Sequence, residues 1–355
     1  MESQEVLFEE KVGKQGSLGI ITLNRQDALN ALNRSMIQSL DKQLVLWEKA
    51  DYIKAVVIRA AEGRAFCAGG DIRFTYEQWL QHEEAAVIQL FYDEYRLNRR
   101  IFHYPKPFIA LLDGITMGGG VGISIHGSHR VATERLVFAM PETGIGFFPD
   151  VGGSYFLPRL PGKVGYYLGL VGPRINHNDC CAIGLTQHLV SRAVLPTIIE
   201  AVAETNLGQD AKMTVTQLLK QFSMLAQPST LASLQTDIDA CFGADTVEAI
   251  VASLESCANP WGRDTAALLR KKSPTSLKVT LQQLSAGRHL DFDSCMQLEF
   301  RLVNRFLQEH DFREGVRAVI IDKDQSPQWQ PASLEAVTAE IIKPYFLPLA
   351  EELPF

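Results

Sequence analysis

Three consecutive glycines at positions 118–120 constrain this chain more than any other feature of its sequence. They follow an apolar segment, residues 108–112, that ends at Asp113 and Gly114, and they open a second apolar segment. The pattern predicts a strand, a tight turn and then a helix whose first turn carries almost no side chains. Three glycines cost a helix stability, so either close packing or a ligand must account for them. Backbone N–H groups at such a helix start are open to a ligand.

Two carboxylates follow the glycine turn in an apolar setting. Glu142 comes directly after Met140 and Pro141, and Asp150 comes after a Phe-Phe-Pro segment at 147–149. Partial burial would favour the neutral form of Glu142 and keep its carboxylate basic. The pattern therefore predicts an acid–base site that faces an oxyanion hole. The simpler alternatives are a solvated loop glutamate and, for Asp150, a turn residue or the cap of the next helix.

Composition limits the classes of partner. The 355 residues carry a net charge of −7 and show no basic stripe, so we expect no nucleic-acid partner. No apolar run reaches the length of a membrane span, so we expect no membrane partner. The first residues lack a signal-peptide core and transit-peptide character, which favours a cytoplasmic protein. The six cysteines show no metal-like spacing, so we expect free thiols and no metal site.

The order of the apolar segments predicts an α/β layered fold. Strands are expected at 6–12 and 18–24 as a hairpin, and at 55–58 and 108–112. Helices are expected after Asn33, which can cap its N-terminus, and at 84–102, where prolines follow. The alternation of strand and helix ends near residue 190, and helical periodicity follows. We therefore predict an α/β core at 1–192 and a mostly helical region at 193–355.

Three blocks, at 24–32, 66–72 and 114–120, resemble the crotonase (enoyl-CoA hydratase/isomerase) superfamily. Four further segments resemble its thioesterase branch and extend the likeness over nearly the whole chain, at 91–98, 140–162, 273–280 and 310–331. The resemblance implies an α/β fold of the ClpP/crotonase type, a spiral of ββα units. It also implies that the helical C-terminal region completes the acyl pocket.

The same resemblance implies hydrolysis of 3-hydroxyisobutyryl-CoA to 3-hydroxyisobutyrate and CoA, a step of valine breakdown. The catalytic groups would be Glu142 and Asp150, with the backbone N–H groups of Gly70 and Gly119 as the oxyanion hole. The small-molecule acyl-CoA brings CoA as part of the substrate, so no separate cofactor or metal is implied. The substrate-binding residues would be Arg25, Ala68, Gly70, Glu94, Gly119, Glu142 and Asp150. Whether the chain forms a homo-oligomer stays open.

Several alternatives stand beside this interpretation. Glu94 could instead pair with the arginines near it on its helix, and Arg25 could be a surface residue. A hydratase needs a second glutamate, and the matching position here is Gly122; Asp150 stands where hydratases commonly have glycine. These two departures favour a thioesterase over an enoyl-CoA hydratase/isomerase. A non-catalytic binding relative, for example one that binds RNA, is opposed by the net charge of −7.

Overall fold

The computed structural model describes residues 5–355 and divides into two compact units. Unit 1 comprises the described residues up to Gly70, Arg96–Phe138 and Arg174–Ala232. Unit 2 comprises Asp71–Tyr95, Ala139–Pro173 and Ser233–Phe355. The units therefore alternate along the chain. The predicted domain boundary at residue 192 stays a prediction.

Unit 1 contains a six-stranded sheet with the order β1-β2-β3-β5-β7-β10. The strands are β1 (Val6–Gly13), β2 (Gly16–Leu23), β3 (Ile53–Ala60), β5 (Phe108–Leu112), β7 (His129–Thr133) and β10 (His188–Val190). β1 and β2 pair in antiparallel fashion, which confirms the hairpin predicted at 6–12 and 18–24. All other neighbours in this sheet are parallel, as the alternation of strand and helix requires.

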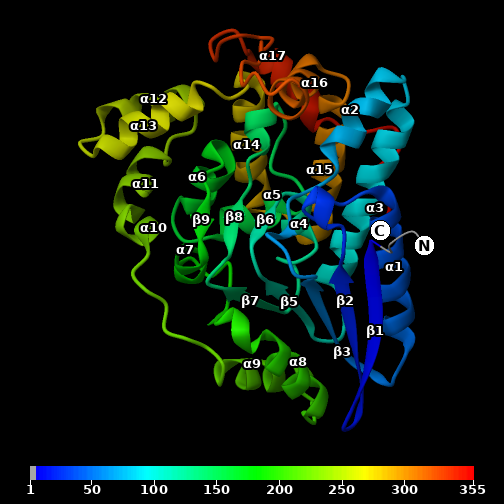
Figure 1. The fold of residues 1–355 in the computed structure, drawn as a ribbon. Coiled ribbons are helices and arrows are strands. Elements are labelled where there is room, and N and C mark those ends of the chain that lie inside the picture. Colours follow the sequence, from blue (N-terminus) through cyan, green and yellow to red (C-terminus); the bar gives the residue numbers. More distant parts are fainter. Residues whose placement is uncertain (1–4) are drawn as a thin grey trace. The chain divides into compact units, whose positions relative to one another are not determined.

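Helices cover both faces of this sheet (Figure 1). Leu18 and Ile20 of β2 pack in one cluster with apolar residues of α8 (Leu195–Glu204) and α9 (Ala211–Lys220). Between them Gly19 points the other way, where a Cβ would lie 2.7 Å from the ring of Trp47 on α1 (Arg34–Lys49). The predicted cap of α1 is confirmed, because Met36 N donates to Asn33 Oδ1 at 2.9 Å.

A second sheet has the order β4-β6-β8-β9. Its strands are β4 (Ala65–Cys67), β6 (Ile115–Met117), β8 (Val137–Ala139) and β9 (Ile175–Asn176). Sequence analysis did not predict β6, which lies between the Asp113–Gly114 turn and the glycines. Parallel pairing of β6 with β4 gives these residues ladder hydrogen bonds, and the glycine helix α4 is only Gly119–Gly122. Unit 1 also holds α7 (His177–Ala182) and most of α10 (Thr230–Ser233).

Unit 2 is built mainly from helices, and those that follow Ser233 confirm the helical C-terminal region. Its helices are α2 (Ile72–Leu80), α5 (Gly153–Phe156), α6 (Val164–Val171), α11 (Gln235–Cys241), α12 (Val247–Ser256), α13 (Pro260–Leu269), α14 (Pro274–Gly287), α15 (Phe292–Phe306), α16 (His310–Val316) and α17 (Ala339–Ile342). The predicted helix at 84–102 is α3 (Glu84–Phe102), whose residues up to Tyr95 belong to unit 2.

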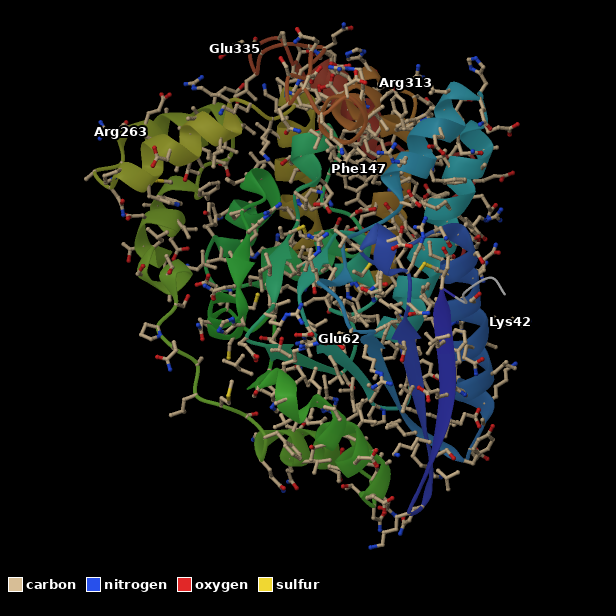
Figure 2. The ribbon with its side chains drawn as sticks, viewed as in Figure 1. Lys42, Glu62, Phe147, Arg263, Arg313 and Glu335 are labelled. Atoms are coloured by element: carbon tan, nitrogen blue, oxygen red, sulfur yellow. The ribbon has the colours of Figure 1, made fainter. Side chains whose placement is uncertain are left out.

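An aromatic cluster forms the core of unit 2 around Phe147, which Figure 2 labels. The ring centroid of Phe147 lies 4.3 Å from that of Phe312 and 5.6 Å from those of Phe91 and Phe306. Phe148 packs against Phe306 at 5.3 Å. The predicted apolar setting between Glu142 and Asp150 is therefore the centre of this core.

Residues 5–355 contain neither a membrane-spanning helix nor a cluster of metal ligands. No helix in this range is long and apolar enough to cross a membrane. No group of three or more His, Cys, Asp and Glu side chains in the same range could hold a metal ion. None of the six cysteines, all of which lie in the described range, forms a disulfide, and Cys67 is buried.

Candidate active site

Two glycine-containing loops of unit 1 lie side by side because β4 and β6 are parallel neighbours. Each loop follows the carboxyl end of its strand, so residues 68–70 and 118–119 leave the sheet together. A Cβ built on Gly69 would lie only 3.9 Å from the backbone nitrogen of Gly119. The structure therefore brings together the loops of Gly70 and Gly119 that were predicted to supply the oxyanion hole.

The loop that contains Gly70 is held by the segment at 29–32. Leu32 N donates to Gly69 O at 2.8 Å, and Ala68 N donates to Leu29 O at 3.0 Å. Among the described residues, no backbone hydrogen bond starts from the N–H of Gly70 or Gly119. Both N–H groups are thus available to an acceptor.

Different structural constraints apply to the three glycines at 118–120. Gly118 adopts φ +46°, a left-handed conformation that disfavours a side chain. A Cβ on Gly120 would lie 2.2 Å from the carbonyl oxygen of Cys67, so this position requires close packing of α4 on β4. Gly119 sits between them as the first residue of α4. Packing therefore explains Gly120, while the N–H of Gly119 stays open.

Glu142 begins a buried 3₁₀ turn of unit 2, Glu142–Ile145, directly after Pro141. Its side chain is buried, and its Oε2 has no hydrogen-bond partner among the described residues. Burial raises the pKa of Glu142 well above its usual value, and the charge of Asp150 raises it further. Lys272 opposes this shift; its Nζ lies 3.0 Å from where a Cβ on Gly144 would be. The predicted direction of the Glu142 pKa agrees with this geometry.

Asp150 is also buried, at the other end of the Phe-Phe-Pro segment. The hydroxyl of Tyr95 donates to Asp150 Oδ2 at 2.9 Å. Burial raises the pKa of Asp150 to about 7, and the hydrogen bond from Tyr95 partly offsets this rise. Asp150 does not cap the following helix, because the N-cap of α5 is Gly152. The structure thus disfavours the capping alternative.

Glu94 lies on α3, one residue before Tyr95, and is buried. Its Oε1 has no hydrogen-bond partner, and Glu94 forms no ion pair within the described part of the chain. Burial and the charge of Asp150 raise the pKa of Glu94 to about 8. Arg100, one of the arginines considered as a partner, instead pairs with Asp41 at 2.6 Å. The ion-pair alternative for Glu94 finds no support.

Glu299 of α15, a further buried carboxyl group of unit 2, was not predicted from the sequence. Its two oxygens accept the N–H groups of Gly152 and Ser154, each at 2.8 Å. Burial raises the pKa of Glu299 to about 8, although these hydrogen bonds lower it. A signal was present, because Glu299 interrupts the apolar stripe formed by Cys295 and Leu302 on this helix. Tyr95 and Lys272 were missed as well, and their sequence context gives no comparable signal.

The remaining predicted binding residues lie in unit 1. Arg25 Nε pairs with Glu5 at 2.9 Å, and its guanidinium also donates to Ala31 O at 2.9 Å. Asn30 accepts from Arg25 N at 2.8 Å and donates to Phe66 O at 3.0 Å. Arg25 thus supports the segment that holds Ala68, and both a binding and a supporting role stay open.

These features define an α/β protein with two open backbone amides in unit 1 and a cluster of buried carboxyl groups in unit 2. A sequence model of the family described as enoyl-CoA hydratase/isomerase matches residues 18–346. The chain therefore belongs to the enoyl-CoA hydratase/isomerase family, and its fold is the crotonase fold. It is an enzyme.

Curated relatives narrow the comparison. The chain is 44% identical over 348 residues to the mitochondrial 3-hydroxyisobutyryl-CoA hydrolase of Rattus norvegicus, which covers 97% of this chain and 89% of that protein. It is 43% identical over 349 residues to the enzyme of the same name from Homo sapiens, with the same coverage. The sequence resemblance to the thioesterase branch is confirmed.

Two solved structures share the fold. A carnitinyl-CoA dehydratase from Mycobacterium thermoresistibile has a TM-score of 0.91 at 36% identity, over 99% of both chains. An enoyl-CoA hydratase from Rhodobacter sphaeroides has a TM-score of 0.89 at 35% identity, over 99% of this chain and 100% of that one. Their titles name hydration or dehydration, whereas the curated relatives are named as hydrolases.

The comparisons correct one expectation. We expected a cytoplasmic protein, but the named relatives from rat, mouse and human are all mitochondrial enzymes, which points to mitochondria. The expectation rested on the first residues of the sequence, and these are a poor guide to compartment because a targeting segment is removed from the mature protein.

Proposed function

We propose that this enzyme hydrolyses 3-hydroxyisobutyryl-CoA to 3-hydroxyisobutyrate and free CoA, as a step of valine breakdown. The names of the curated relatives support this activity. The observation that carries it is the presence of two buried carboxyl groups with raised pKa values, Glu142 and Asp150, in a chain whose position 122 is a buried glycine. A hydratase would place its second glutamate at that position.

Glu142 is proposed to act on the thioester carbonyl in one of two ways. As a nucleophile, its carboxylate forms a C–O bond, the C–S bond breaks and CoA leaves as a thiolate that takes up a proton. Water then hydrolyses the acyl-glutamyl anhydride and restores the carboxylate. As a general base, Glu142 instead removes a proton from the attacking water. Both routes need the ionised form, so activity should rise with pH through the raised pKa of Glu142.

The N–H groups of Gly70 and Gly119 are proposed to stabilise the oxyanion that forms at the thioester carbonyl. This role is supported by the absence of a backbone acceptor for either N–H in the described chain, and by the parallel pairing of β4 and β6 that brings the two loops together. Loss of one such donor typically lowers the rate about 10²–10³-fold. Ala68 belongs to the same loop, and Arg25 is proposed to bind the CoA phosphates.

Asp150 is proposed to accept a hydrogen bond from the 3-hydroxyl of the acyl group, or to help deliver the water. Glu94 is proposed to bind the acyl portion from α3, because its buried Oε1 lacks a partner in the described chain. A buried polar atom without a partner costs about 1–3 kcal/mol, which a substrate group can offset. No cofactor besides the CoA of the substrate is proposed, and the oligomeric state stays a prediction.

A thiol-release assay tests the proposed activity. Purified enzyme should release CoA thiol from 3-hydroxyisobutyryl-CoA and leave the enoyl absorbance of crotonyl-CoA nearly unchanged. The 3-hydroxypropionyl ester differs by one methyl group, which is worth about 1–3 kcal/mol, so it should also be hydrolysed.

Hydration is the second candidate, because the two solved relatives are named as a dehydratase and a hydratase. Rapid loss of crotonyl-CoA absorbance without thiol release would put this candidate first. Absence of both reactions, together with salt-sensitive RNA binding, would favour the non-catalytic alternative.

The variant Asp150→Ala tests how the acyl group is recognised. A hydrogen bond to a charged group is worth about 1.5–3 kcal/mol. The variant should therefore lose at least about tenfold more kcat/KM on 3-hydroxyisobutyryl-CoA than on isobutyryl-CoA. Equal losses on the two esters would reject the hydroxyl-binding role and favour water delivery.

A further inference from the structure

Glu299 makes contacts that link it to Asp150. It lies on α15 of unit 2 with 0% of its surface exposed. Its Oε2 accepts the N–H of Gly152 and its Oε1 accepts the N–H of Ser154, each at 2.8 Å. These two donors belong to the loop that begins with Asp150 and ends in α5. Each oxygen of the Glu299 carboxyl group thus accepts one backbone N–H, so the contact uses both oxygens as acceptors.

The loop held by Glu299 is strained. Val151, directly after Asp150, has φ +51°, a conformation that β-branched side chains rarely adopt. Such a conformation costs free energy and persists only where its surroundings hold it. In a free loop Val151 would relax to an extended or helical φ, and the direction of the Asp150 side chain would change with it.

A second contact fastens the same loop. The side-chain amide of Gln283 on α14 donates to Pro149 O at 2.7 Å and to Ser154 Oγ at 2.8 Å. Asp150 therefore lies between two anchored positions, one before it at Pro149 and one after it at Gly152. The hydrogen bond from Tyr95 then fixes the carboxylate itself.

We propose that Glu299 is a positioning residue for Asp150: through the N–H groups of Gly152 and Ser154 it holds the strained loop that aims the Asp150 carboxylate. This inference rests on the proposed function of Asp150. Glu299 contacts backbone groups of the enzyme and is not assigned a contact with substrate. A purely structural cap of α5 would have the same hydrogen bonds, so the test needs a readout that loss of stability alone would not change.

The variant Glu299→Gln keeps the shape of the side chain but turns one acceptor into an NH₂ group that opposes a backbone N–H. Misplacement of a catalytic group by about 1 Å can cost about 10²-fold in rate. We therefore expect kcat on 3-hydroxyisobutyryl-CoA to fall by about 10–10²-fold. The preference for 3-hydroxyisobutyryl-CoA over isobutyryl-CoA should fall too, as in Asp150→Ala. Hydrogen exchange at the amides of Gly152 and Ser154 should become faster.

Asp179→Asn is the matched control. Asp179 of α7 in unit 1 is a buried carboxylate whose oxygens also accept two backbone N–H groups, from Leu231 at 3.0 Å and Asn176 at 3.3 Å. This variant should lower Tm to a similar extent while kcat and the ester preference stay near wild-type values. If Glu299→Gln fails to fold, Glu299→Asp is the second variant, because it keeps the carboxyl charge and one acceptor contact. Its kcat and its preference for 3-hydroxyisobutyryl-CoA should fall in the same direction but less.

The outcomes separate this inference from the proposed function. If wild-type enzyme releases no thiol from any acyl-CoA, the proposed function fails and the inference about catalysis falls with it. If wild-type enzyme is active but Glu299→Gln keeps the wild-type kcat and ester preference, only the inference is overturned. Equal losses of kcat in Glu299→Gln and Asp179→Asn would also overturn it, because general destabilisation would then explain both.

Discussion

The two units present their candidate functional groups by different physical means. In unit 1 the groups are the backbone amides of Gly70 and Gly119, which are neutral and placed by parallel strands and the segment at 29–32. In unit 2 the groups are four buried carboxyls, Glu94, Glu142, Asp150 and Glu299. Burial raises the pKa of each, and the charge of Asp150 raises the pKa values of the other three further. The placement of the unit 1 amides depends on steric fit, whereas the properties of the unit 2 carboxyls depend on charge.

This difference predicts how each unit responds to change. A backbone amide has no titration near neutral pH, so unit 1 should be sensitive to added atoms and insensitive to pH. A buried carboxyl is held away from its usual pKa, so unit 2 should carry the pH dependence of both activity and stability. Four variants test the comparison, in order of decreasing expected effect.

Glu142→Gln should have the largest effect. The amide keeps the shape of the side chain but can act neither as nucleophile nor as base, so kcat should fall by about 10²–10⁴-fold or more. Binding of 3-hydroxyisobutyryl-CoA, measured by calorimetry, should stay within about threefold of wild type. The control Glu204→Gln, at an exposed position on α8, should be fully active. Substantial activity in Glu142→Gln would show that another carboxylate performs the chemistry.

Gly120→Ala tests the steric sensitivity of unit 1. The added Cβ would lie 2.2 Å from Cys67 O, so α4 must shift and carry the Gly119 amide with it. We expect kcat to fall by about 10²-fold, as for loss of an oxyanion donor, with little change in the pH profile. Gly184→Ala is the control, because no atom lies within 4 Å of its Cβ and only the φ of +76° is strained. A fall in kcat of the same size in the control would remove the steric explanation.

Tyr95→Phe should change the pH dependence that unit 2 carries. The variant removes the hydrogen bond to Asp150 Oδ2 that lowers its pKa, so the pKa of Asp150 should rise further above about 7. If the ionised form is active, the acid limb of kcat/KM moves to higher pH by about one unit, and activity at pH 7 falls about tenfold. Tyr104→Phe removes a hydroxyl that donates to Leu44 O at 3.1 Å in unit 1, and should leave the profile unchanged.

Glu94→Gln comes last because the effect tested is on stability and not on the rate of the reaction. The folded-state pKa of Glu94 is raised to about 8 from an ordinary value of 4.5. Between pH 4.5 and about pH 8, Glu94 keeps a proton in the folded chain that it releases in the unfolded chain. The free energy of unfolding therefore falls as the pH rises through this range. The variant lacks this loss and should gain about 1 kcal/mol relative to wild type for each pH unit between pH 5 and pH 8, measured by urea unfolding. A constant difference across this range would contradict the raised pKa.

Local patterns were sufficient for much of the fold. The hairpin of β1 and β2, the cap of α1 by Asn33 and the ends of α3 follow from turn residues, a capping side chain and prolines close in sequence. The family resemblance, which the comparisons confirm, added the crotonase fold and the thioesterase branch of the family. It also singled out Gly70, Gly119, Glu142 and Asp150, whose roles stay predictions. Strand β6 was not foreseen, because three residues after a turn become a strand only when β4 pairs with them.

The sequence by itself determined which residues could do chemistry here: glycines that expose amides, and carboxylates set among phenylalanines and prolines. Only the tertiary structure decided that Glu299, 147 residues from Gly152, holds the loop of Asp150. It likewise decided that Glu94 has no ion pair in the described chain, and that burial moves the pKa of Asp150 to about 7. The physical reason is that burial and charge coupling depend on distances between segments far apart in the chain, which no local pattern encodes.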